Sequence, residues 1–260
     1  MRTIAVDWSG ARIRAANTIW LAEVNDGRLV RLENGRNREQ VADFLVAQSE
    51  SDPAMIVGFD FAFSLPAWFL EERGLENARE LWALADRDAE DWLARCEPPF
   101  WGRPGKGRPD LGPRRDHFRR TDTDVPDTGG IRPKSVFQIG GAGAVGTGSL
   151  RGMPILHRMA AQGFSVWPFG STDLPLIVEI YPRVLTGAVN KSSNSERAAY
   201  LSRYRSELSS ELLERAASSE DAFDAAVSAL VMSRSFENRV ALAVPRDRKT
   251  LLEGQIWHPV

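Results

Sequence analysis

The 260-residue chain contains a single cysteine, Cys96, and only three histidines, which are scattered along the sequence. One cysteine excludes an internal disulfide framework and a cysteine-rich zinc site. The chain also lacks any apolar run long enough to cross a bilayer, and no apolar signal-peptide segment follows Met1-Arg2. We therefore expect a cytoplasmic protein that does not enter a membrane.

A large excess of charge is also missing. The net charge is −2 at pH 7, with 43% hydrophobic and 26% charged residues, which is ordinary for a globular protein. This balance gives no global attraction to nucleic acid or to anionic membranes, although it is compatible with a local basic patch. The length is sufficient for a large core. We expect a single domain over residues 1–260.

The apolar pattern predicts a mixed α/β fold. Three strands over 4–8, 18–24 and 29–33 form an antiparallel meander, because Asn25-Asp26-Gly27 between the last two is a strong hairpin signal. The other predicted elements are a helix over 38–49, a strand over 55–63, helical residues over 71–97, a strand over 135–140, a helix over 149–162, strands over 165–169 and 176–182, a helix over 195–217, a helix starting at 218–221, and a closing turn and strand over 252–257.

An insertion over about 65–134 interrupts this pattern. It begins as helix and continues as a loop rich in Gly and Pro, and residues 101–120 contain seven Lys or Arg against two Asp. This composition predicts a mobile basic loop rather than a core element. Two interpretations stay open, a solvated surface loop and a lid that attracts substrate phosphates.

Several carboxylates lie on elements whose neighbours are apolar or small. Burying an unpaired carboxylate costs several kcal/mol, so each should have a partner, a metal or a capping role. The small neighbours on the strands leave room for another element to approach the sheet. The two helical members are three residues apart and point the same way. These carboxylates are Asp7, Asp60, Glu179, Asp221 and Asp224.

Grouped carboxylates raise one another's pKa unless a cation is present. An oxygen-only ligand set suits Mg²⁺ or Mn²⁺. Two such ions about 4 Å apart can activate a water molecule and stabilise the leaving oxygen during phosphodiester cleavage. The sequence therefore indicates metal-dependent hydrolysis of a phosphodiester.

Each carboxylate also has a structural interpretation. Asp224 is the hardest to explain in this way, because Asp is a poor helix former. The other interpretations are a turn cap for Asp7, a helix cap for Asp60, an ion pair with Arg183 or another basic side chain for Glu179, and a favourable helix-dipole position for Asp221.

The stretches 5–10, 57–66, 178–182, 221–226 and 253–257 resemble a known arrangement. Together with the meander and the following helix, they are similar to the ribonuclease-H-like fold, and in particular to an uncharacterised family of predicted ribonuclease-H-like nucleases. The resemblance implies a five-stranded mixed sheet flanked by helices, with the helical and basic-loop insertion described above.

Within this wider fold, Holliday-junction resolvases also carry a first-strand Asp, a fourth-strand acid and a helical Asp-x-x-Asp-Ala. That similarity places Asp7, Asp60, Asp221 and Asp224 at metal-binding positions and leaves Glu179 outside the shared set. We expect Asp7, Asp60 and Asp224 to bind Mg²⁺ or Mn²⁺, and Asp221 and Glu179 to support catalysis.

The segment Gly141-x-Gly143-x-x-Gly146 matches a dinucleotide-binding fingerprint between a predicted strand and a predicted helix. Its position after antiparallel strands, and the lack of an acidic residue ending a second strand about 20 residues later, argue against nicotinamide binding. Backbone amides that hold a substrate phosphate, and a simple tight turn, both remain open. The predicted substrate-binding residues are Arg114, Arg115, Arg119, Arg120, Lys134, Gly141 and Gly143.

The leading hypothesis is therefore a nuclease that acts on nucleic acid or a nucleotide through a carboxylate-bound Mg²⁺ or Mn²⁺. One alternative is a nucleotide-binding ATPase or kinase-like protein of the same fold, although such proteins normally need two facing domains. The other alternative is a non-catalytic binding module, in which the carboxylates are far apart or paired with arginine.

Overall fold

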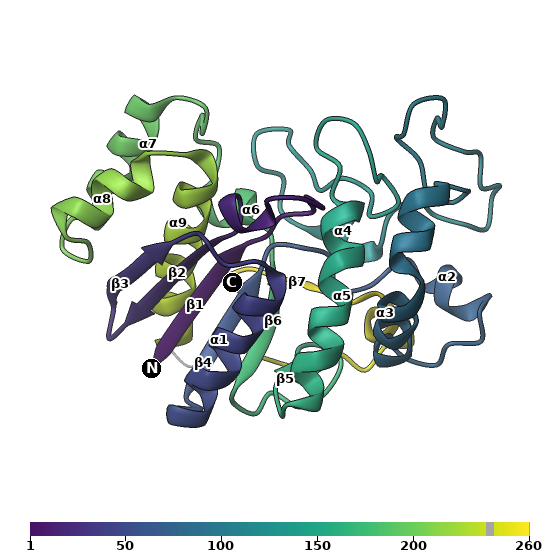
Figure 1. The fold of residues 1–260 in the computed structure, drawn as a ribbon, viewed down its shortest axis with the longest axis horizontal. Coiled ribbons are helices and arrows are strands. Elements are labelled where there is room, and N and C mark those ends of the chain that lie inside the picture. Colours follow the sequence, from purple (N-terminus) through teal and green to yellow (C-terminus); the bar gives the residue numbers. More distant parts are fainter. Residues whose placement is uncertain (238–241, 260) are drawn as a thin grey trace.

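The computed structural model describes residues 1–237 and 242–259. In these residues seven strands form one mixed sheet, in the order β3-β2-β1-β4-β6-β5, with β7 also paired to β6 (Figure 1). β1 to β3 are antiparallel, whereas β1, β4 and β6 are parallel neighbours. The strands are β1 (Arg2–Asp7), β2 (Trp20–Asn25), β3 (Arg28–Glu33), β4 (Met55–Phe59), β5 (Ser165–Val166), β6 (Leu176–Ile180) and β7 (Ile256–Trp257).

Helices cover both faces of the sheet, as the mixed α/β prediction requires. α1, α3 and α5 pack on one face and α8 and α9 on the other (Figure 1). No helix in the described part of the chain is long and apolar enough to span a membrane. The helices are α1 (Arg38–Ser51), α2 (Ala67–Glu71), α3 (Ala78–Arg95), α4 (Arg120–Asp124), α5 (Gly146–Ala161), α6 (Pro182–Thr186), α7 (Asn194–Leu201), α8 (Ser210–Ala217), α9 (Glu220–Glu237) and α10 (Arg248–Glu253), with 3₁₀ turns η1 (Ala15–Asn17) and η2 (Ser202–Tyr204).

The first strand is buried on both faces. Ile4 and Val6 pack with α1 and α5, whereas Ala5 between them packs with α9. This alternation explains why the strand is apolar throughout, as expected for a strand in the middle of a covered sheet. The β2–β3 turn has positive φ at both Asp26 and Gly27, the backbone of a tight hairpin.

The sheet has seven strands and not the five expected, because the short strands β5 and β7 extend it beside β6. Two other predicted elements also differ from the structure. No strand forms over 135–140; residues there turn, and Phe137 and Ile139 pack into the core beside α3 and α5. Among the described residues, the β-pairing of this stretch is limited to one isolated parallel bridge between Gln138 and Trp101. The predicted helix over 195–217 is divided into α7, η2 and α8, and Ser209 caps α8 by accepting from the amide of Leu212.

The insertion contains more buried structure than its composition indicates. Most of 102–118 is irregular and exposed, as predicted for a basic loop. However, Trp101, Arg119, Thr121 and Asp122 are buried. Trp101 and most of the stretch 119–122 of the insertion therefore belong to the core, so the insertion is not wholly a surface segment.

Candidate functional site

Asp7 and Asp60 lie side by side at the carboxyl edge of the sheet. β1 and β4 are parallel neighbours, and Val6 is in register with Phe59. A carboxylate residue follows each of these two, and the backbone amide of Asp60 donates to the carbonyl oxygen of Val6 at 3.1 Å. Both aspartates are partly buried. Register alone thus brings together two predicted ligands that are 53 positions apart in the sequence.

Helix α9 brings Asp221 and Asp224 to the same edge. The helix begins directly after Ser219, whose hydroxyl accepts from the amide of Ala222 at 3.0 Å. The negative charges of both helical aspartates raise the pKa of Asp7, which places them near the strand carboxylates. Four predicted site residues from three separate segments therefore lie at the same edge of the sheet.

A row of small residues allows this convergence. Ala22, Ala5 and Gly58 are successive register partners across β2, β1 and β4. A Cβ atom added to Gly58 would lie 2.6 Å from Sδ of Met232 on α9. The prediction that small residues beside the carboxylates permit another element to approach the sheet is confirmed.

The four aspartates repel one another. Burial, followed by the charges of Asp60, Asp224 and Asp221, raises the pKa of Asp7 well above its usual range. Burial and then Asp224 raise the pKa of Asp60 to about 8. Burial also raises the pKa of Asp221 and that of Asp224. The cluster holds more negative charge than the neighbouring groups neutralise, which is the condition that a bound cation relieves.

The ammonium group of Lys191 enters this cluster. Its Nζ lies 2.5 Å from Oδ2 of Asp224, and both side chains are about nine-tenths buried. Oδ1 of the same carboxylate is buried and has no hydrogen-bond partner in the described structure. The lysine charge also lowers the pKa of Asp7 and that of Asp60, against the larger effect of burial. Lys191 is therefore a partial counter-ion for the whole group.

Arginines hold the segment that carries Lys191. Arg197 donates to the carbonyl oxygen of Lys191 and, at 2.9 Å, to that of Ala217. Arg183 donates to the carbonyl oxygen of Val189 at 2.8 Å. The lysine is thus positioned by its backbone and does not simply extend from a surface loop.

Glu179 projects to the other face of the sheet. It is in register with Phe59, whose ring packs among α1, α3 and α5, whereas its neighbours Val178 and Ile180 pack with α9. Successive side chains of a strand point to opposite faces. Glu179 therefore does not join the four aspartates, although its charge still raises the pKa of Asp60.

A buried ionic network holds Glu179 in place. Its carboxylate is 2.6 Å from Nη2 of Arg119, which is also 2.7 Å from Asp122. The other carboxylate oxygen of Glu179 accepts from the backbone amide of Phe63 at 2.9 Å. The ion-pair interpretation of Glu179 is the one that fits, with Arg119 as its partner in place of Arg183.

Arg119 has no donor left for a substrate. Its five N–H groups are directed at Asp122, Glu179 and the carbonyl oxygen of Glu253. Its side chain is 2% exposed. These contacts tie the end of the insertion to β6 and to the end of α10, and they argue against the predicted contact of Arg119 with substrate phosphates.

A cavity of about 190 Å³ opens beside Asp60. Aromatic side chains from two strand ends, Trp8 and Tyr181, line it together with Lys134 and the start of α5 at Gly148. The charges of Asp60 and Asp224 contribute, after burial, to raising the pKa of Tyr181, so this phenol is near the carboxylates. The cavity connects the aspartate edge with the glycine-rich segment.

The other basic residues predicted to contact substrate lie apart from this cavity. Arg115 pairs with Glu72 at 2.6 Å, and Arg120 pairs with Asp247 at 2.9 Å. Arg114 is exposed on the loop. Of the basic residues predicted to contact substrate, Arg119 and Lys134 line the cavity. Arg119 is already paired, so in the described structure Lys134 is the one whose charge a substrate could meet.

The glycine-rich segment is a tight turn. Gly141 and Gly143 have φ values of +80° and +70°, a conformation that favours glycine. Without a strand before it, the segment lacks the context of a dinucleotide-binding unit. A Cβ at Gly146 would lie 2.1 Å from the carbonyl oxygen of Val136, so this glycine is required for packing.

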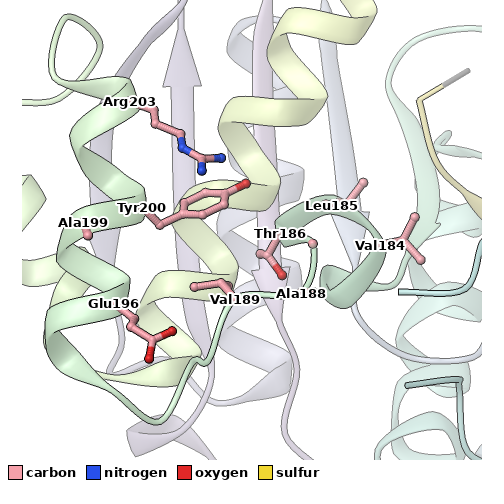
Figure 2. A pocket seen from close by; sticks show the side chains of 10 residues that line it. Val184, Leu185, Thr186, Ala188, Val189, Glu196, Ala199, Tyr200 and Arg203 are labelled. Carbon is pink, nitrogen blue, oxygen red and sulfur yellow. The ribbon is translucent and has the colours of Figure 1, made fainter. Parts of the chain in front are cut away.

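A second hollow, of about 600 Å³, lies beside α6 and α7. Figure 2 shows Tyr200 and Arg203 on one side of it and Thr186 and Val189 on the other. Its lining contains one acid, Glu196, and otherwise mainly small or apolar side chains. This composition does not offer the grouped carboxylates found at the sheet edge.

Lys191 and Tyr181 are the site residues that sequence reasoning does not identify. Lys191 lies in a polar turn without a local motif, and 33 positions separate it from Asp224. Tyr181 directly follows a strand that carries an acid, and this position is the one feature of the sequence that could have identified it as a site residue.

Within residues 1–237 and 242–259, Asp, Glu, His and Cys side chains form no group of three arranged around a metal position. The four aspartates lie at one edge of the sheet, but the carboxylate of Asp224 pairs with Lys191. Comparisons with family models, with curated proteins and with solved structures gave no match for this chain.

Proposed function

We propose that this protein hydrolyses phosphodiester bonds in nucleic acid with the help of a divalent cation bound by Asp7, Asp60 and Asp224. The observation that carries the proposal is the convergence of these three aspartates, with raised pKa values, at one edge of the sheet. Asp221 contributes further negative charge beside them. The β1–β3 meander, β4 beside β1 and an acidic late helix also support the ribonuclease-H-like resemblance.

The side chains fit an oxygen-seeking cation. Oδ1 of Asp224 is buried without a partner, and the carboxylates of Asp7 and Asp60 form no hydrogen bond or ion pair in the part of the chain described. Carboxylate oxygens are the ligands that Mg²⁺ and Mn²⁺ prefer. When bound, such an ion supplies Lewis acidity and a more acidic water.

The remaining residues have roles of their own. Lys191 holds the orientation of Asp224 and carries a positive charge toward the edge where a phosphate would lie. Lys134, which lines the cavity, offers a second positive charge. Trp8 and Tyr181 give the cavity apolar surfaces against which a sugar or base can pack.

The test is a cleavage assay with labelled single-stranded DNA, duplex DNA and RNA in Mg²⁺ or Mn²⁺. Asp7→Asn should abolish cleavage while retaining the fold, and wild-type cleavage should stop in EDTA. Manganese binding, followed by electron paramagnetic resonance, should weaken in the same variant. Absence of turnover by the wild type on every substrate, or equal turnover by Asp7→Asn, would refute the proposal.

A non-catalytic binding module is the second candidate, and one observation favours it. Lys191 already supplies a counter-charge to Asp224, so the edge is partly neutralised by the protein itself. On this alternative Mg²⁺ would not bind at millimolar concentration. The ATPase or kinase-like alternative is less well supported, since the described chain has one sheet where that function normally needs two facing domains.

A further inference from the structure

A groove of about 630 Å³ lies next to the aspartate edge, and arginines dominate its lining. It is formed by the loop after β1, the start of α1, the middle of α3 and the first turns of α5. Three acids accompany the basic residues. The arginines are Arg12, Arg14, Arg38, Arg87 and Arg151.

Much of this positive charge is not neutralised within the protein. In the described residues, Arg12, Arg14 and Arg38 form no ion pair, and the first two are exposed. Arg151 pairs with Glu90, and Arg87 pairs with Asp88, which lies outside the lining. Glu39 is engaged by a residue outside the groove. The groove therefore carries an excess of positive charge although the whole protein has a net charge of −2.

Two of the arginines also build the wall between the groove and the catalytic edge. Arg38 donates to the carbonyl oxygens of Ser9 and Ala11, each at 2.6 Å. Arg151 donates to the carbonyl oxygen of Gly10. Burial and the charge of Arg151 lower the pKa of Arg38 to about 10, so the two guanidinium groups are held together against their repulsion.

The wall is thin. Gly10 and Gly148, which line the cavity beside Asp60, are so close that a Cβ on Gly10 would lie 2.6 Å from the backbone nitrogen of Gly148. Arg12 and Leu150, each two positions after one of these glycines, line the arginine groove on the other side. A chain molecule crossing this wall would pass from the carboxylates directly to the arginines.

We propose that the arginine groove binds the sugar–phosphate backbone of a nucleic-acid strand at a distance from the bond that is cut. Repeated phosphates match a row of guanidinium groups, which bind them through parallel N–H donors. The lining has no aromatic side chain for stacking, so recognition is of the backbone and is independent of base sequence. The location of the bond that is cut rests on the proposed function, whereas strand binding can be measured without cleavage.

The test uses fluorescence anisotropy of a labelled 20-nucleotide single-stranded DNA in EDTA, between 50 and 200 mM salt. Arg12→Ala/Arg14→Ala should weaken binding about tenfold and reduce the slope of log K against log salt by about 0.7 for each lost phosphate contact. The matched control is Arg28→Ala/Arg205→Ala, which removes two exposed arginines outside the groove. An abasic strand should show the same loss as the normal strand.

Three results would overturn the proposal: no binding by the wild type, equal loss in the two double variants, or a loss that requires bases. If poly-glutamate competes as strongly as the abasic strand, the groove belongs to an acidic protein partner instead. The outcome is separate from that of the cleavage assay. Weaker binding by the groove variant, with no cleavage by any protein, supports the groove and refutes the hydrolase.

Discussion

Lys191 and Asp224 form the one ion pair within the aspartate cluster, as far as the described residues show, with 2.5 Å between Nζ and Oδ2. The second oxygen of the same carboxylate is buried without a partner. A side chain that is half-satisfied in this way can exchange its lysine for a metal ion. Substitution of Lys191 therefore distinguishes the two candidate functions. The catalytic proposal requires a metal ion at Asp224, whereas the binding-module proposal requires only the lysine there.

Lys191→Met should change metal binding and stability in opposite directions. In EDTA we expect a loss on the order of 2 kcal/mol, because Asp224 keeps its burial and loses its donor. Mg²⁺ should bind about tenfold more tightly, since each 1.4 kcal/mol of competing ion pair corresponds to a factor of ten. Calorimetric titration and urea unfolding measure the two effects. Lys191→Arg is the control, and unchanged Mg²⁺ affinity in Lys191→Met would contradict the prediction.

The pKa of Asp60, raised to about 8, has a consequence for stability. A carboxyl with a raised pKa holds its proton in the folded state after the unfolded chain has lost it. The free energy of unfolding of the metal-free protein therefore falls as pH rises from about 4 to 8.

Asp60→Asn removes this contribution. Between pH 5 and 9 the variant should gain on the order of 2–4 kcal/mol relative to wild type. Urea unfolding at several pH values in EDTA measures the difference, and saturating Mg²⁺ should reduce it. Parallel pH profiles for the two proteins would show that Asp60 titrates normally.

Arg119→Ala should lower the free energy of unfolding, because Arg119 has a structural role and does not contact substrate. The substitution leaves Glu179 and Asp122 buried without their partner, at a cost of about 3–5 kcal/mol. Arg120→Ala is the matched control, because its exposed pair with Asp247 contributes about 1 kcal/mol or less. Thermal and urea unfolding compare the two. A stable Arg119→Ala protein that has lost nucleic-acid binding would instead restore the substrate role.

Gly58→Ala tests whether α9 must lie close to the sheet. The new Cβ would meet Sδ of Met232 at 2.6 Å and Cγ2 of Ile180 at 2.9 Å, so we expect a loss of about 1–3 kcal/mol. Gly107→Ala, where nothing lies within 4 Å, should change stability by less than about 0.5 kcal/mol. A double-mutant cycle with Met232→Ala should show coupling between the two positions, and additive effects would argue against the contact.

Much of the fold could be predicted from the sequence because its signals are local. The Asn25-Asp26-Gly27 turn fixes the β2–β3 hairpin, and Asn37 with Gln40 caps α1. The strand over 135–140 could not be told from an apolar core turn, since both present Phe137 and Ile139 to the interior. Short apolar runs are ambiguous in this way.

The candidate site was predictable where strand ends and helix spacing determine position. Parallel register places Asp7 beside Asp60, and the close approach of α9 to β4 at Gly58 brings the helix that carries Asp224 to the same sheet. Glu179 and Arg119 are different. Whether Glu179 faces the aspartates depends on the pleat of β6 at one residue, and the partner of Arg119 is 60 positions away in the sequence.

The pleat at Glu179 gives two charged groups near this edge different surroundings, although both reach the same cavity. In one group, burial and mutual repulsion of four aspartates raise the pKa of Asp7, and Lys191 supplies a counter-charge. In the other group, Glu179, Arg119 and Asp122 are buried and paired with one another, and they fasten a long insertion to the core. An acid close to Asp60 therefore serves as a structural anchor, because Arg119 already neutralises it. The exposed part of the insertion, most of 102–118, can change in length and sequence without disturbing this anchor.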